Sequence, residues 1–139
     1  MNLYPLTTLI TLTLIAMGVW LASRVATARQ TYADQHDDQG LFHSPQIYSD
    51  RIFMIAFRNQ TNFCECLLLF RPLLWLAAVS YGDYWAASLG LSYVLGRFLY
   101  ARNYPMGHRG GVMVANLSML ILLLAVAAHA VFSLAGVIS

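Results

Sequence analysis

Three polar side chains on one predicted helix have the types and the spacing of a ligand site. Arg58, Asn62 and Glu65 are separated by four and then three residues, which places them on one face of a helix. The stripe offers a cation, an amide and a carboxylate in a row. Two interpretations are open: a binding site, or half of an ion-pair network between helices.

A second polar stripe follows on the next predicted helix. Arg97, Tyr100 and Tyr104 are separated by three and then four residues, and Arg102 and Arg109 follow at the end of that helix. Guanidinium groups bind carboxylates through paired hydrogen bonds, and a lone Glu among arginines can hold an amine. Together the stripes predict a site for a small zwitterionic ligand with more than one carboxylate.

Two other groups of reactive side chains are weaker candidates. Cys64 and Cys66 stand two residues apart, so on a helix they point to different faces and cannot bridge each other. We interpret them as small packing residues. His36, Asp37 and Asp38 lie in a polar stretch, but three adjacent residues rarely converge on one ion. We therefore expect a solvated loop and no metal, with a metal site in the loop as the alternative.

The elements that carry these stripes are membrane helices by composition. The chain has 139 residues, of which 59% are hydrophobic and 10% charged, against roughly 25% charged in an average soluble domain. A net charge of +2 is too small to indicate nucleic acid as a partner. The expected fold class is all-α, a single integral membrane four-helix bundle. A spanning helix needs about 20 mainly apolar residues, and four segments qualify, at about 3–27, 49–81, 84–104 and 110–137.

Residues that interrupt helices separate the four segments. The polar stretch from Asp34 to Ser49 predicts a loop, and Ser49 is the predicted N-cap of the second helix. Gly82 and Asp83 predict a tight turn. The break before the last span contains Pro105, Gly107, Gly110 and Gly111. The second segment is longer than a hydrocarbon core of about 30 Å, so we expect its polar first half to project from the bilayer.

The positions of the arginines orient the helices. The chain has no Lys, and all but one Arg flank the first and third loops. These are Arg24, Arg29, Arg51, Arg58, Arg97, Arg102 and Arg109. The positive-inside rule then predicts that both loops are cytoplasmic and both termini outside, in what we expect to be a bacterial inner membrane. The exception, Arg71, is late in the second helix and is expected to snorkel toward the far interface.

The stretch from Arg58 to Tyr104 resembles the MAPEG family, the membrane-associated proteins in eicosanoid and glutathione metabolism. It is similar to the branch of the microsomal glutathione transferases and leukotriene-C synthase. The family's Arg-x3-Asn-x2-Glu pattern is present, with the Phe and Trp that follow it and the Gly, Tyr and Arg of the third helix. The matching residues are Arg58, Asn62, Glu65, Phe70, Trp75, Gly90, Tyr93, Arg97, Tyr100 and Tyr104. The segment from Ala28 to Tyr32 resembles the basic end of the family's first helix.

The resemblance implies a homotrimer with a glutathione site between neighbouring subunits, near the cytoplasmic interface. It implies an apolar cosubstrate that arrives from the lipid, either an electrophile or a lipid hydroperoxide. The residues it implies for holding glutathione are Arg29, Arg58, Gln60, Asn62, Glu65, Arg97, Tyr100 and Tyr104. It implies that Arg109 is the catalytic residue that stabilises the thiolate.

Several positions depart from the leukotriene-C synthase branch. Cys66 stands in place of a ligand-binding Tyr, and Gln30 in place of a second Arg. Arg109 comes two residues earlier than the catalytic Arg of that branch, and Arg71 replaces an apolar position. These differences argue against leukotriene synthesis in particular and leave thiol transfer or peroxidase activity.

Three functions follow from these observations. The leading one is a glutathione transferase or glutathione-dependent peroxidase in detoxification. The first alternative is a lipid-binding or scaffold member of the same family that does not turn over a substrate. The second is a small four-span exporter, but such proteins usually carry an acidic residue in the membrane part of the first helix, and residues 3–27 contain none.

Overall fold

Four long helices make up most of the chain. The structure, a computed structural model, describes residues 3–36 and 45–136. The elements are α1 (Pro5–His36), η1 (Pro45–Ser49), α2 (Arg51–Tyr81), α3 (Asp83–Arg102) and α4 (Arg109–Leu134), where η1 is a short 3-10 helix. No strand occurs in the described residues. The prediction of an all-α, four-helix fold is confirmed.

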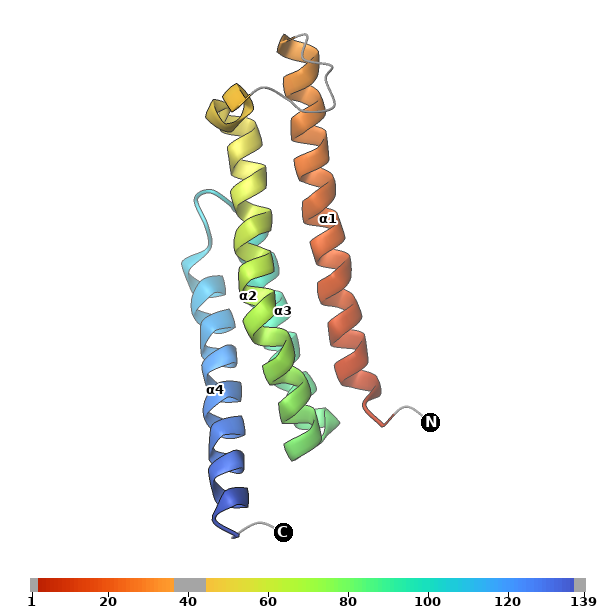
Figure 1. The fold of residues 1–139 in the computed structure, drawn as a ribbon, viewed down its shortest axis with the longest axis vertical. Coiled ribbons are helices and arrows are strands. Elements are labelled where there is room, and N and C mark those ends of the chain that lie inside the picture. The colour runs from red at the N-terminus through yellow and green to blue at the C-terminus, as the bar shows by residue number, and fades with distance from the viewer. Residues whose placement is uncertain (1–2, 37–44, 137–139) are drawn as a thin grey trace.

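The helices run up and down along one long axis (Figure 1). α1 and α4 stand on either side of α2, and α3 lies behind α2 in this view. α1 begins at the same end of the bundle at which α4 ends. At the other end, the last turns of α1 and the first turns of α2 extend beyond α3 and α4. That extension contains the first turns of α2, whereas Asn59 and Asn62 already lie level with α3, to which both are hydrogen-bonded.

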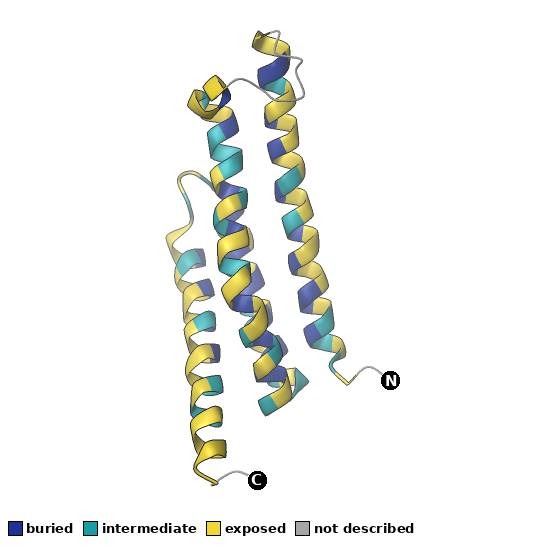
Figure 2. Ribbon diagram, in the orientation of Figure 1, coloured by how far each residue is buried: buried dark blue, intermediate teal, exposed yellow. Residues whose placement is uncertain are grey.

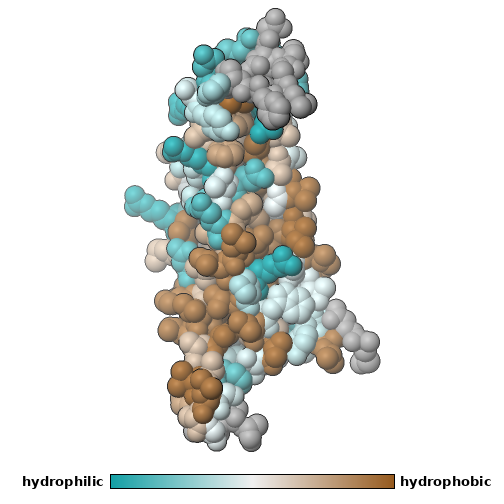
Figure 3. Space-filling view, viewed as in Figure 1, coloured by the Kyte–Doolittle hydropathy of each residue, from teal (hydrophilic) through white to brown (hydrophobic). Residues whose placement is uncertain are grey.

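Hydrophobic side chains cover much of the lower part of the surface in Figure 3, and the upper end is more hydrophilic. Among the described helices, α1, α2 and α4 are long and apolar enough to cross a membrane. α3 has 20 residues, which is about 30 Å and therefore long enough, but Asp83, Arg97 and Arg102 lower its hydropathy. α3 contacts all three other helices, so it needs less apolar surface of its own. The chain is an integral membrane protein in which α1, α2 and α4 are the helices apolar enough to span the membrane by themselves.

Buried residues line the sides on which the helices face one another (Figure 2), and they include aromatic, aliphatic and small side chains. Phe70 of α2 stacks on Tyr93 of α3, with ring centroids 3.5 Å apart and planes 5° from parallel, and both side chains are buried. A Cβ atom on Gly90 would lie 3.0 Å from Ile10 Cγ2 and 3.1 Å from Leu74 Cδ1. Gly90 therefore lets α1, α2 and α3 approach one another closely, and this part of the sequence motif has a packing role.

Two glycines bring the backbones of α3 and α4 into contact. A Cβ on Gly96 would lie 2.5 Å from the carbonyl oxygen of Gly111, and a Cβ on Gly111 would lie 2.7 Å from that of Gly96. The prediction that Gly110 and Gly111 break the chain is wrong, because both belong to the first turn of α4. That helix is capped by His108, whose Nδ1 accepts a hydrogen bond from the Gly111 amide at 2.9 Å. The absence of a side chain at Gly111 thus serves packing rather than a turn.

The start of α2 also differs from the prediction. Asp50 is the N-cap, and its Oδ1 accepts a hydrogen bond from the Phe53 amide at 2.7 Å. Ser49 belongs to η1 and cannot take that position. The predicted loop is shorter than expected, because α1 continues through His36 and residues 45–49 form η1. Residues 37 and 38 lie outside the described residues, so the metal site suggested for this loop remains untested.

Asp83 joins the start of α3 to the start of α1. Its carboxylate accepts hydrogen bonds from the backbone N–H groups of Leu6 and Thr7, each at 2.8 Å. Asp83 is the first residue of α3 and follows Gly82, whose φ of 94° is a conformation that glycine adopts readily. Loss of water around the carboxylate raises the pKa of Asp83, but the hydrogen bonds from the Thr7 and Leu6 amides outweigh this effect and lower the pKa below its usual value. The first turn of α1 contains no acidic residue of its own, so Asp83 supplies the cap.

Candidate functional site

Arg97 is the only charged side chain that is buried among the described residues, with 6% of its surface exposed. Its Nη2 donates a hydrogen bond to Asn62 Oδ1 at 3.0 Å. Its guanidinium carbon lies 5.2 Å from the ring centroid of Tyr100 and 5.8 Å from that of Phe63. Its Nε has no hydrogen-bond partner in the described part of the chain. The two polar stripes of the sequence therefore meet at Arg97 and Asn62, where the buried Nε–H of Arg97 has no partner in the described part of the chain.

Tyr100 and Tyr104 extend this cluster to the loop after α3. Their ring centroids are 5.7 Å apart in an edge-to-face arrangement. Gly107 of the loop packs against Tyr100, since a Cβ on Gly107 would lie 3.3 Å from Tyr100 Cε2. The backbone of the loop therefore covers one side of the tyrosine pair.

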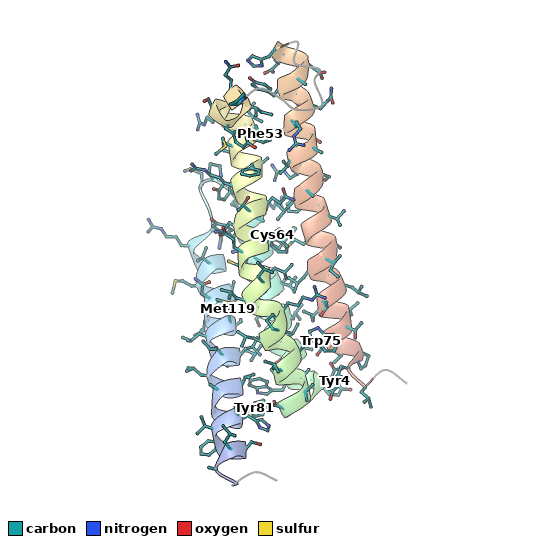
Figure 4. The ribbon with its side chains drawn as sticks, in the orientation of Figure 1. Tyr4, Phe53, Cys64, Trp75, Tyr81 and Met119 are labelled. Atoms are coloured by element: carbon teal, nitrogen blue, oxygen red, sulfur yellow. The ribbon has the colours of Figure 1, made fainter. Side chains whose placement is uncertain are left out.

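Tyr104 also lines a hollow of about 300 Å³ together with Arg58 and Arg51. The other residues around it are Tyr48, Met54, Ile55 and Pro105. Both guanidinium-bearing side chains are exposed. On α2 the positions of Arg58 and Asn62 fall between the labelled Phe53 and Cys64 (Figure 4). We call Arg97, Asn62, Phe63, Tyr100 and Tyr104 the Arg97 cluster. Tyr104 belongs both to this cluster and to the lining of the hollow, so it links the two.

Asn59 is a buried residue of this region that the sequence analysis did not single out. It is 3% exposed, and its Nδ2 donates a hydrogen bond to the carbonyl oxygen of Ala101 at 2.9 Å, which ties α2 to α3. Its Oδ1 has no partner among the residues that the structure describes. The helical spacing could have indicated this burial. Asn59 follows Arg58 and is turned by about 100° around the helix, away from the exposed stripe and toward the core.

Four of the predicted site residues lie outside the cluster in a single chain. Arg29 of α1 lies over the ring of Phe53, 6.0 Å from its centroid. Gln60 is half-buried, and Glu65 and Arg109 are exposed. Within residues 3–36 and 45–136, none of these last three side chains makes a hydrogen bond or an ion pair. One chain therefore assembles only part of the predicted site.

The alternative of an ion-pair network receives no support within one chain. Neither Arg58 nor Glu65 has an ion-pair partner among the described residues. A network that includes side chains of a second copy stays open. Cys64 and Cys66 are both free thiols, so the prediction that they do not bridge each other is confirmed.

The arrangement has the chemistry of an anion-binding surface. Arg97 brings a buried cation with an unused N–H, Arg58 and Arg51 bring two exposed guanidinium groups, and the tyrosines bring phenols that can donate or accept. Guanidinium groups bind carboxylates with paired, charge-assisted hydrogen bonds. The donors lie at two places, the cluster and the hollow, which suits a ligand with carboxylates at two positions.

Comparison with known proteins agrees with the sequence motifs. The chain matches the family model described as MAPEG family over residues 7–135. No curated protein matches the sequence. The matched region includes all the residues of the Arg97 cluster and of the hollow, and it covers nearly the whole of the four-helix bundle. The chain therefore belongs to the MAPEG family of integral membrane proteins.

Proposed function

We propose that this protein is a membrane-bound glutathione transferase, a glutathione-dependent peroxidase, or both. The observation that carries the proposal is the buried Arg97, bonded to Asn62 and stacked on Tyr100, beside the Arg58-lined hollow. Membership of the MAPEG family supports a function related to glutathione. Glutathione is a tripeptide with two carboxylates, one amine and one thiol, so it matches the donors and acceptors that the two stripes provide.

The proposed ligand contacts follow the charges. Arg58 and Arg97 bind carboxylates, Glu65 accepts from the amine, and Asn62, Gln60, Tyr100 and Tyr104 complete the hydrogen bonds. Arg29, Glu65 and Arg109 lie apart from the Arg97 cluster within one chain. We therefore propose that the full site lies between neighbouring subunits of a homotrimer, where side chains of two copies face each other.

The proposed chemistry depends on a glutathione thiolate. A free thiol has a pKa of about 8.5, and the thiolate is the nucleophile. A fixed cation favours the ionised form, and we assign this role to Arg109. The thiolate sulfur attacks the electrophilic carbon of a lipophile, a carbon–sulfur bond forms, and the leaving group departs with its electron pair.

The same thiolate can reduce a lipid hydroperoxide. The sulfur attacks the terminal oxygen, the O–O bond breaks, and the remaining alkoxide takes a proton to leave as an alcohol. The glutathione sulfenic acid that results reacts with a second glutathione thiol, which gives the disulfide and water. No metal is needed for either reaction.

The test of the proposal starts with binding. In calorimetry, the detergent-purified protein should bind glutathione, and it should then conjugate glutathione to 1-chloro-2,4-dinitrobenzene. Failure to bind glutathione would overturn the proposal. The Arg109→Ala variant should still bind glutathione but lose the thiolate absorbance of the complex, whereas Arg102→Ala, an exposed Arg at the end of α3, should retain it.

One observation favours a second candidate function. Arg109 is exposed and makes no hydrogen bond or ion pair with the Arg97 cluster within the described residues. One chain by itself therefore has the ligand donors without the catalytic Arg, and a family member that binds lipid or thiol, or acts as a scaffold, without turnover needs no more than these donors. Such a protein would bind ligand, show no conjugation, and be indifferent to Arg109→Ala.

We also propose an orientation for the bundle. The end of the bundle that holds the start of α1 and the last turn of α4 would face outward. The arginine-rich end would face the cytoplasm. Glutathione would then reach the site from the cytoplasm and the lipophile from the bilayer.

A further inference from the structure

The exposed face of α2 carries two unpaired charges in an otherwise apolar stretch. Glu65 and Arg71 are both exposed, and neither has an ion-pair partner among the described residues. Around them, Leu68 is 76% exposed and Leu69 is 62% exposed. One negative and one positive charge therefore stand on the same apolar surface without compensation in one chain.

Arg71 lies well inside α2 and not at its end. α2 continues for ten more residues and ends at Tyr81, about 15 Å further along the axis. In a hydrocarbon core of about 30 Å that ends level with Tyr81, Arg71 would lie near the middle of the bilayer. A charge at that depth normally faces a bundle interior, a water-filled cavity or an opposite charge. Something outside the single chain must therefore cover this guanidinium.

The two charges stand on opposite flanks of the exposed face. Six residues separate Glu65 from Arg71, which is about 120° around a helix with 3.6 residues per turn. The 120° arc from Glu65 to Arg71 does not include the core-facing side of α2, which is marked by Phe63 and Phe70. In a ring of identical copies, each helix presents one flank to the preceding copy and the other flank to the next. The Glu65 flank of one copy would then meet the Arg71 flank of its neighbour.

The surface next to Arg71 has room for a neighbour. A hollow of about 430 Å³ is lined by Cys64, Leu67, Leu68, Arg71 and Pro72. Side chains on a helix lean toward its N-terminus, so the long stem of Arg71 leans toward the level of Glu65. The difference in level between the two residues is about 9 Å, which an arginine and a glutamate can close from facing helices.

From this charge complementarity we infer that the exposed face of α2 packs against α2 of a second copy of this chain, with Arg71 of one copy paired with Glu65 of the next. Where Glu65 accepts from the ligand amine, which rests on the proposed function, Arg71 of the partner copy positions the Glu65 carboxylate. A carboxylate has two oxygens, so a paired Glu65 still accepts from a ligand amine. The pairing goes beyond the proposed function, and its test needs no glutathione.

A charge exchange tests the pair. Glu65→Arg and Arg71→Glu, each alone, place like charges together and should convert the oligomer into monomers, measured by native mass spectrometry in mild detergent. The double variant restores opposite charges and should restore the oligomer. The control is Arg102→Glu, an exposed charge reversal at the end of α3, which should leave the oligomer intact. An oligomer that persists in both single variants would overturn the inference.

Cross-linking tests the pairing of Arg71 with Glu65 even where a charge reversal prevents folding. Cys64 and Cys66 are first replaced by Ala, and chains with Glu65→Cys are co-expressed with chains that carry Arg71→Cys. A short thiol cross-linker should join the two kinds of chain in the membrane, and chains with Arg102→Cys should not be joined to either. Lack of the cross-link overturns the pairing. An Arg71→Gln variant with an unchanged oligomer and weaker retention of an acidic phospholipid also overturns it, since Arg71 would then face lipid.

Discussion

At the scale of single residues, Arg97 shows how a cation is kept inside this bundle. A buried charge is costly unless it is paired or hydrogen-bonded. Arg97 has one hydrogen bond to Asn62 and two aromatic faces, Phe63 and Tyr100, and a desolvated cation–π contact contributes roughly 2 kcal/mol. Its Nε lacks a partner among the described residues. The side chain is therefore held in place but not saturated, which suits a residue that receives a ligand.

Arg97→Lys tests this arrangement. Lysine keeps the charge but loses the planar group that stacks on rings and bonds at fixed angles. We expect a loss of roughly 1.5–3 kcal/mol in the free energy of unfolding, the range for a hydrogen bond to a charged group, measured by thermal melting in detergent. The control Arg102→Lys, exposed on the same helix, should change it by less than about 0.5 kcal/mol.

Asn62→Ala should be non-additive with Arg97→Lys, because the two side chains share a hydrogen bond. Simple additivity of the two losses would show that the bond contributes nothing to stability.

At the scale of helices, the contact between α3 and α4 depends on two positions without a side chain. A methyl group on Gly111 would meet the Gly96 carbonyl oxygen at 2.7 Å, so the helices would have to move apart. We expect Gly111→Ala to destabilise the protein by roughly 1–3 kcal/mol, the usual cost of overpacking.

Gly110→Ala is the matched control for Gly111→Ala. It lies one residue away in the same turn, and its nearest neighbour would be the His108 side chain at 3.4 Å, an ordinary contact. Because alanine favours helix over glycine by about 1 kcal/mol, Gly110→Ala should be neutral or stabilising in the same melting assay. Equal melting temperatures for the two variants would contradict the backbone contact.

The link between α3 and α1 through Asp83 predicts a pH dependence. The pKa of Asp83 is lowered in the folded protein by the amides of Thr7 and Leu6, so the ionised form stabilises the fold. This contribution is present above the pKa of an unfolded Asp, about 3.9, and it is lost as the pH falls through the folded value. Asp83→Asn should therefore melt at a lower temperature than the wild type at pH 7, and the difference should shrink below about pH 4.

Asp34→Asn is the control for Asp83→Asn. Asp34 is exposed and accepts a hydrogen bond only from the Gln30 side chain among the described residues. Its replacement should leave the melting curve nearly unchanged at both pH values. A gap between Asp83→Asn and wild type that stays constant down to pH 3 would argue against the carboxylate cap.

At the scale of the whole molecule, the sequence predicts helices better than it predicts their contacts. The four segments and the stripes of Arg58 and Arg97 follow from apolar runs and helical periodicity, and both can be read locally. Gly111 was misread because a glycine that ends a helix and a glycine that packs a helix look alike in one sequence. The burial of Asn59 depends on where α3 lies, which no local pattern contains.

The candidate site could be predicted only in part for a related reason. Arg97, Asn62, Tyr100 and Tyr104 come together because α2 and α3 are consecutive helices joined by a tight turn. Arg29, Glu65 and Arg109 do not join them within one chain. Their proposed positions depend on a neighbouring copy, and helix stripes do not reveal how copies are arranged.

The orientation of the molecule can be tested with reporters. A periplasmic alkaline phosphatase fused after Gly136 should be active in a bacterial host, and green fluorescent protein fused at the same place should be dark. A phosphatase inserted after Met106, in the turn between α3 and α4, should be inactive. The opposite pattern would reverse the orientation proposed from the arginines.

The cap that Asp83 provides has a consequence for the order in which the helices are completed during synthesis. The carboxylate that caps α1 is 77 positions downstream of the Leu6 amide that it binds. A ribosome therefore delivers the first helix to the bilayer well before it has made the residue that completes the start of that helix. α1 reaches its final fit only when the hairpin of α2 and α3 has been inserted. The first helix to be synthesised is thus not the first to be finished.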